Sequence, residues 1–214
     1  LDQRTVLIQG IVMFAIACVI GLYFIYLYQI LFWFVLAGGL LTVLYTPVLT
    51  KMVITEIFPG IGLGVIPVIG AYIVMQPVGN VHLPSALWWL SIPPGILVSA
   101  LLWINELPDI KADCATGRRH AVLLLGTRKA VWGYAILLVL TYIQIIIPVA
   151  MQILPVWSLM GLLTIPVAIK AATGAVKNHD NIEGIIPALG QNVITVLVTP
   201  VLMAVGIGIA AILK

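Results

Sequence analysis

Charged residues are scarce in this sequence. Asp, Glu, Lys and Arg make up 8% of its 214 residues, whereas a soluble domain carries about 25%. The longest polar stretch, residues 105–129, is much shorter than a typical domain of roughly 50 residues or more. The scarcity of charge excludes an ordinary soluble protein and leaves no room for a separate soluble domain. We therefore predict one transmembrane domain over residues 1–214.

Cysteine is also rare. Cys18 lies inside the first apolar run and Cys114 in the polar stretch, with no CxxC pair and no Cys/His spacing typical of zinc sites. The sequence gives no indication of a disulfide framework, and Cys114 is interpreted as an incidental thiol.

Long apolar runs, by contrast, are abundant, and hydrophobic residues make up 63% of the chain. A run of about 20 apolar residues is long enough to cross a bilayer as a helix, and the runs are continuous rather than alternating. The first run has no basic segment before it and is too long for a signal-peptide core. We predict an all-α, polytopic transmembrane helical bundle with seven spans, at roughly 6–27, 30–46, 57–76, 84–104, 129–152, 154–172 and 188–213.

The charges divide unequally between the two ends of these spans. Numbering the loops alternately places nine of the ten Lys and Arg residues, and all seven carboxylates, at the same end, and leaves only Lys214 at the other. An excess of Lys and Arg marks the cytoplasmic side of a membrane protein. The sequence thus predicts an integral, multi-pass protein of the cell membrane whose charged loops face the cytoplasm.

A charged segment follows the fourth predicted span. Asp109 and Asp113 are four residues apart, which would place both carboxylates on one helical face, and Asn105 would extend that face. Paired carboxylates at a membrane edge suit Mg²⁺, which usually takes one or two carboxylates plus waters and substrate phosphates. Arg118 and Arg119 could bind a diphosphate, because guanidinium groups bind phosphate in a bidentate manner. The alternative is a solvated loop whose acids balance its own cations.

Two segments resemble a known family. Residues 105–126 read N-E-L-P-D-I-K-A-D-C-A-T-G-R-R-H-A-V-L-L-L-G, which resembles the second aspartate-rich motif of the UbiA superfamily of intramembrane prenyltransferases. The earlier segment from Tyr45 through Lys51 to Glu56, followed by a glycine-rich span, is similar to the Tyr/Lys loop of that family. The likeness is nearest to the branch that prenylates naphthoquinone precursors.

The resemblance implies an activity and a set of partners. It implies Mg²⁺-dependent transfer of a polyprenyl group from its diphosphate to an acceptor, which would be an aromatic or quinone precursor or a lipid. The other expected partner is membrane lipid, and no nucleic-acid partner is expected. Asp109 and Asp113 would hold Mg²⁺ and, with Lys51, act in catalysis. The substrate-binding residues would be Asn105, Tyr45, Lys51, Arg118 and Arg119, with the cations neutralising the departing pyrophosphate.

The chain also departs from the family pattern. Family members have nine spans and an earlier N-x-x-x-D-x-x-x-D motif, whereas this sequence shows seven spans and no such motif. We expect the chain to lack the first two helices and the first aspartate motif of the family, and so to be a fragment of a larger helical bundle.

The sequence is also compatible with other functions. A secondary transporter, or another polytopic membrane protein with a cytoplasmic charged loop, is the main alternative, although a transporter predicts polar residues near mid-span and repeat symmetry. A CDP-alcohol phosphotransferase would need a longer D-G-x-x-A-R signature, and a purely structural subunit needs no site.

Single polar residues have simpler interpretations. Lys51 could be a snorkelling residue at the membrane boundary, and His120 is interpreted as a bystander. Gln144, Gln191 and Asn192 are predicted to bridge helices, and the glycines at 60, 62 and 64 to allow close helix packing.

Overall fold

The computed structural model describes residues 2–213, which contain helices and no strands. The α-helices are α1 (Gln3–Leu27), α2 (Leu31–Tyr45), α3 (Ile57–Pro59), α4 (Ile66–Val74), α5 (Ser85–Ala115), α6 (Ala121–Leu125), α7 (Thr127–Ala150), α8 (Ile165–Lys177) and α9 (Ile182–Ile212). Two 3₁₀ segments, Leu49–Lys51 and Val156–Thr164, and one π-helical segment, Gly60–Val65, complete the described secondary structure.

These helices have the length and composition of membrane spans. Six continuous segments of the described chain are long and apolar enough to cross a membrane, and α2 adds a shorter apolar helix of 15 residues. A helix falls in each of the seven segments predicted from the sequence. The protein is therefore an integral, multi-pass, all-α membrane protein, as predicted.

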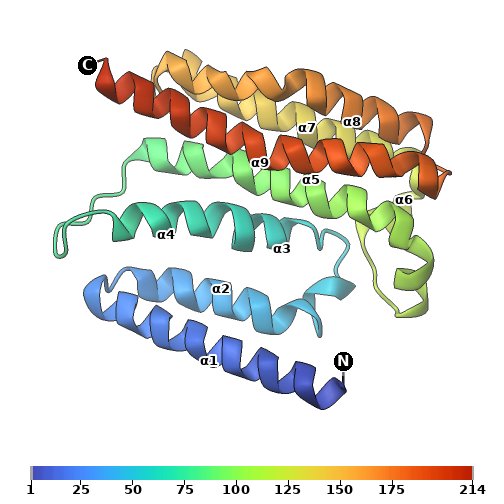
Figure 1. Cartoon of the computed structure of the whole chain (residues 1–214), viewed down its shortest axis with the longest axis horizontal. Helices are drawn as coiled ribbons and strands as arrows, with labels where there is room; N and C mark the ends of the chain where they lie inside the picture. Colours follow the sequence, from blue (N-terminus) through green and yellow to red (C-terminus); the bar gives the residue numbers. More distant parts are fainter. Residues whose placement is uncertain (1, 214) are drawn as a thin grey trace.

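The helices run along a common direction in an ordered stack (Figure 1). The hairpin of α1 and α2 lies at one side, and the segment from α3 to α4 stands between α2 and α5. Helix α5 packs against α7 and α9, and α8 packs against both of these helices. The larger cluster of buried side chains lies among α5, α7, α8 and α9, whereas α1 buries no residue. Helices α5, α7, α8 and α9 therefore form the core, and α1 lies at its margin.

Two glycines fix the packing of the third span on α5. A Cβ at Gly60 would collide with Oγ of Ser99, and a Cβ at Gly64 would lie 2.5 Å from Cα of Gly95. The two backbones approach so closely that only glycine fits. This contact supports the prediction that small residues in this span serve helix packing.

Helix α5 is longer than the sequence analysis predicted. The fourth span was expected to end near residue 104, but the helix continues through Pro108 to Ala115. It stops just before Gly117, whose φ of +73° suits a residue without a Cβ. The predicted end of the fourth span near residue 104 was therefore wrong, whereas the helical spacing predicted for Asn105, Asp109 and Asp113 lies within this one helix.

The polar connections gather at one end of the stack. Segments 46–56, 116–126 and 178–181 lie at the right-hand end in Figure 1, and segments 75–84 and 151–155 lie at the opposite end. The three segments at the right-hand end carry Lys51, Glu56, Arg118, Arg119 and Asp180, whereas the two at the opposite end carry no Asp, Glu, Lys or Arg, as the alternation of loops predicts.

Candidate functional site

A polar pocket of about 380 Å³ opens at the end where the charged segments meet. It lies between the chain that follows α2 and the C-terminal end of α5. Its lining residues are Tyr45, Thr46, Thr50, Lys51, Asp113, Thr116, Gly117 and Arg118. Tyr45, Lys51, Asp113 and Arg118 are thus the predicted site residues that the fold brings together.

Local backbone structure holds the two sides of this pocket in contact. The left-handed turn at Gly117 redirects the chain at the end of α5. The backbone N–H of Arg119 then donates a hydrogen bond to the carbonyl oxygen of Thr50, with a nitrogen–oxygen distance of 3.1 Å. The hydroxyl of Thr50 in turn donates to the carbonyl oxygen of Thr46, 2.8 Å away. These bonds join the segment before Lys51 to the segment that carries Arg118.

Asp113 is the buried carboxylate of the pocket, with a relative exposure of 7%. Nη1 of Arg118 donates a hydrogen bond to Oδ1 of Asp113 at 2.9 Å. This hydrogen bond raises the pKa of Arg118, against a smaller opposing effect of burial. The second oxygen, Oδ2, has no hydrogen-bond partner and lies 3.2 Å from Nε2 of His120.

Three predicted residues lie outside the pocket lining. Asn105, Asp109 and Arg119 are exposed, and none of them is among the residues that line the pocket. Asp109 and Asp113 share one helix and are one turn apart, as predicted, but one is exposed and the other buried. The structure therefore distinguishes between carboxylates that the sequence treated as equivalent.

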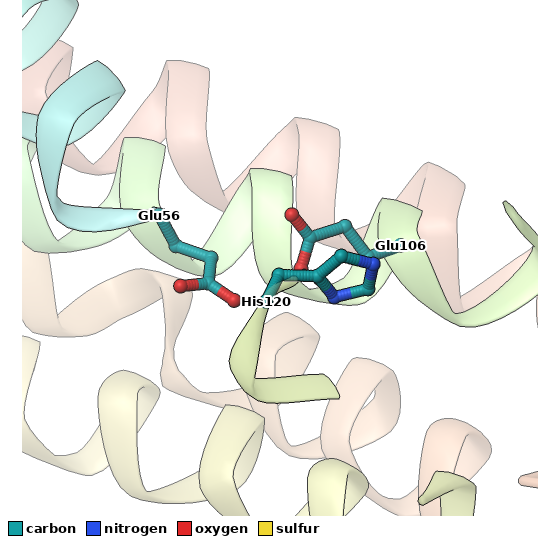
Figure 2. A group of neighbouring side chains, drawn as sticks. All are labelled: Glu56, Glu106 and His120. Carbon is teal, nitrogen blue, oxygen red and sulfur yellow. The ribbon is translucent and has the colours of Figure 1, made fainter. Parts of the chain in front are cut away.

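A buried cluster of two glutamates and a histidine lies beside the pocket (Figure 2). Glu106 and Glu56 are each 2% exposed, and His120 is fully buried. Oε2 of Glu106 lies 3.1 Å from Nδ1 of His120, and Oε1 of Glu56 accepts a hydrogen bond of 3.2 Å from the backbone N–H of Ala121. His120, which was interpreted as a bystander, has its imidazole ring between Glu106 and Asp113.

Burial and mutual charge shift the pKa values in this cluster. Removal from water, aided by the nearby charge of Glu106 and opposed by backbone hydrogen bonds, raises the pKa of Glu56 to about 7. Burial alone would lower the pKa of His120, but the carboxylates of Glu106 and Asp113 outweigh that effect and raise it. Both pKa shifts favour the protonated form, a neutral Glu56 and a positively charged His120, and so reduce the negative charge of the cluster.

The sequence held one signal for this cluster that was missed. Glu106 precedes Asp113 by seven residues, and seven residues are close to two helical turns, so the two carboxylates share a face once the helix is known to continue. No local pattern places Glu56 there, because its contact with Ala121 joins residues 65 positions apart.

The carboxylates of α5 fit the Mg²⁺ that the resemblance implies. Oδ2 of Asp113 is buried without a hydrogen-bond partner, and Asp109 presents an exposed carboxylate one turn away on the same helix. Mg²⁺ usually takes one or two protein carboxylates and completes its shell with waters and substrate phosphates. The carboxylates of Asp109 and Asp113 match this requirement for one or two carboxylate ligands.

Comparison with known proteins gives a family match. The sequence pattern of the UbiA prenyltransferase family matches residues 1–184. The chain is 26% identical over 189 residues to a Bacillus subtilis (strain 168) protein named 1,4-dihydroxy-2-naphthoate octaprenyltransferase, and the match covers 84% of this chain and 58% of that relative. The chain thus spans less than two thirds of the length of this curated relative. No solved structure matches.

Proposed function

This chain belongs to the UbiA prenyltransferase family, and we propose on that basis that it binds a polyprenyl diphosphate and transfers the prenyl group to an aromatic acceptor. The observation that carries the proposal is the polar pocket, which combines two cations, Lys51 and Arg118, with the carboxylate of Asp113. Cations suit the diphosphate, and a carboxylate with a free oxygen suits the metal that accompanies a diphosphate.

The chemistry of prenyl transfer explains why such a pocket is useful. The bond between C1 of the prenyl group and the diphosphate oxygen breaks, and its electron pair stays on the diphosphate. An aromatic carbon of the acceptor then bonds to C1, and the acceptor loses a proton. Negative charge therefore accumulates on the leaving group in the transition state, where fixed cations stabilise it more than they stabilise the bound substrate.

Each pocket residue has a role in this proposal. Lys51 and Arg118 neutralise the departing diphosphate, and Asp113 holds the guanidinium of Arg118 in place through their 2.9 Å hydrogen bond. Tyr45, at the end of α2, faces the same pocket and is positioned to shield the allylic cation from water. Arg119 and Asn105 remain proposed contacts of the substrate from outside the pocket lining.

Mg²⁺ is the proposed cofactor, with Asp109 and Asp113 as its ligands from this chain. When bound, it would add positive charge beside the diphosphate oxygens. The protein residues do the remaining work, since they bind and orient the donor at the mouth of an apolar bundle. Exclusion of water from this site would protect the carbocation.

The name of the Bacillus relative suggests the acceptor. That protein is named for 1,4-dihydroxy-2-naphthoate and an octaprenyl group, so we propose a hydroxylated naphthoate as the acceptor class and a long polyprenyl diphosphate as the donor. The pocket would face the cytoplasm, because the charged segments carry the excess of Lys and Arg.

A transfer assay tests this function. The purified protein in lipid nanodiscs is incubated with octaprenyl diphosphate, Mg²⁺ and 1,4-dihydroxy-2-naphthoate, and the prenylated product is measured by mass spectrometry. We expect product formation that depends on Mg²⁺ and falls at least tenfold in Lys51→Gln. Lys129→Gln, a change outside the pocket lining, is the matched control. Transport of the diphosphate or acceptor across the membrane without product would contradict the proposal.

A further inference from the structure

We propose that Glu56, Glu106 and His120 form a buried binding site for a divalent transition-metal cation such as Mn²⁺ or Zn²⁺. The three side chains come from separate parts of the fold: the segment before α3, the middle of α5, and the segment before α6. Each offers one donor atom, and these atoms all lie within 4.8 Å of one another. Its three ligands differ from those of the Mg²⁺ site proposed at Asp109 and Asp113, and Oδ2 of Asp113 lies 3.2 Å from Nε2 of His120.

Unsatisfied donor atoms point to a missing cation. Both carboxylate oxygens of Glu106 and Oε2 of Glu56 are buried without a hydrogen-bond partner, although buried polar atoms nearly always have one. The backbone N–H of Leu123 points to Nδ1 of His120 at 3.3 Å, so this nitrogen presents a lone pair. Oε2 of Glu106 faces the same nitrogen at 3.1 Å. Two acceptors that face each other at this distance need a proton or a metal cation between them.

The charge balance leads to the same conclusion. No Lys or Arg in the described part of the chain forms an ion pair with Glu56 or Glu106. Arg118 neutralises only Asp113. With both glutamates ionised and His120 neutral, the cluster carries two negative charges in a buried place, which is costly unless they are paired or coordinate a metal. A divalent cation supplies the charge that is missing.

The distances suit coordination. Donor atoms about 2.1 Å from one ion can lie at most about 4.2 Å apart, so a cluster within 4.8 Å needs only small side-chain adjustments. For the 3.1 Å pair of Glu106 and His120, such bonds would meet at roughly 95°. The 3.3 Å contact of Leu123 is longer than an ordinary hydrogen bond of about 2.9 Å, and a metal would readily replace it.

Asp113 supports the metal-binding form of the histidine. With Nδ1 on the metal, the proton of His120 resides on Nε2, which lies 3.2 Å from Oδ2 of Asp113. A carboxylate behind the second nitrogen is the usual arrangement around a metal-bound histidine, and it fixes the tautomer and the ring orientation. One imidazole and two carboxylates are typical ligands of Mn²⁺, Fe²⁺ or Zn²⁺ rather than of Mg²⁺, which prefers oxygen alone.

Electron paramagnetic resonance with Mn²⁺ tests the site directly. The full chain is purified in detergent, stripped with EDTA and titrated with Mn²⁺ alone, without any diphosphate. We expect tight binding and, in pulsed spectra, modulation from an imidazole nitrogen. Glu106→Gln and Glu56→Gln are each expected to weaken binding at least tenfold, and His120→Gln to remove the nitrogen signal. His179→Gln is the matched control and should leave both signals intact.

Thermal unfolding provides a second readout and a check on folding. Mn²⁺ should raise the unfolding midpoint of the EDTA-treated wild-type protein, because a ligand that binds only the folded state stabilises it. The midpoint of folded Glu106→Gln or Glu56→Gln should not respond, and either variant suffices if the other fails to fold. No binding to the wild type, or nitrogen modulation that survives His120→Gln, would overturn the proposal and indicate that protons balance the cluster. Because no prenyl diphosphate is present, failure here leaves the proposed prenyl transfer untouched.

Discussion

The guanidinium of Arg118 donates a hydrogen bond of 2.9 Å to Oδ1 of Asp113. Asp113 belongs to the last turn of α5, and Arg118 follows the end of that helix. This pair places a cation and a carboxylate side by side in one pocket, while the neighbouring Arg119 lies outside its lining. Adjacent arginines with the same chemistry are therefore expected to differ in function.

Arg118→Gln should weaken binding of a non-hydrolysable prenyl diphosphate analogue by about 10- to 100-fold. A hydrogen bond to a charged group contributes about 1.5–3 kcal/mol, and about 1.4 kcal/mol corresponds to a factor of ten. Arg119→Gln should change the affinity less than about threefold. Isothermal titration calorimetry in detergent measures both, and equal losses in the two variants would contradict the assignment of Arg118 to the pocket.

Gly64→Ala should destabilise the bundle, because its Cβ would lie 2.5 Å from Cα of Gly95 and force the third span away from α5. Overpacking of this kind costs about 1–3 kcal/mol. Gly62→Ala is the control, since its Cβ would meet only Cδ1 of Leu41 at an ordinary 3.5 Å. Thermal unfolding in detergent should separate the two variants, and equal midpoints would show that the close approach is not required.

Tyr134→Phe should also destabilise the protein, by about 1 kcal/mol. The buried hydroxyl of Tyr134 donates to Oδ1 of Asn192 at 2.8 Å, which joins α7 to α9 and bears out the predicted bridging role of Asn192. Nδ2 of Asn192 already lacks a partner, so the variant leaves the amide without either bond. Tyr26→Phe, at a residue that is 83% exposed, is the control and should leave the unfolding midpoint unchanged.

The stability of the EDTA-treated protein should fall as pH rises. Burial raises the pKa of Glu56 to about 7 from an ordinary value of 4.5, so between these values the folded state holds a proton that the unfolded state has released. The stabilisation is fully present below about pH 4.5 and is lost as pH rises toward 7, by an amount on the order of 3 kcal/mol.

Glu56→Gln provides the comparison, because its amide cannot titrate. The variant should show a smaller decline in unfolding midpoint between pH 5 and 7.5 when midpoints are measured by tryptophan fluorescence. A wild-type midpoint that stays constant or rises over this range would show that Glu56 is ionised in the folded protein.

Much of the fold could be predicted because a bilayer imposes a simple length rule. Runs of about 20 apolar residues predicted the spans, and their alternation predicted that Lys51 and Arg118 would lie at the same end of the bundle. The resemblance then indicated Tyr45 and Asp113 as further site residues. The pocket that contains all four agrees with that expectation, although their roles stay predictions.

The buried cluster could not be predicted in the same way. The fourth span was ended where apolar residues end, and the helical face predicted beyond it included only Asn105, Asp109 and Asp113, so the face that Glu106 shares with Asp113 was missed. His120 reaches both carboxylates only because the chain reverses at Gly117. Glu56 is brought there by the packing of the third span on α5, which depends on contacts between residues distant in the sequence.

Mg²⁺-dependent binding of a non-hydrolysable prenyl diphosphate analogue to the purified protein tests the central claim most directly. The measurement compares the wild type with Asp109→Ala/Asp113→Ala, each with and without Mg²⁺. We predict that Mg²⁺ tightens binding to the wild type at least tenfold and that the double variant loses this dependence. Binding that is indifferent to both the metal and the substitutions would contradict a diphosphate site at the end of α5.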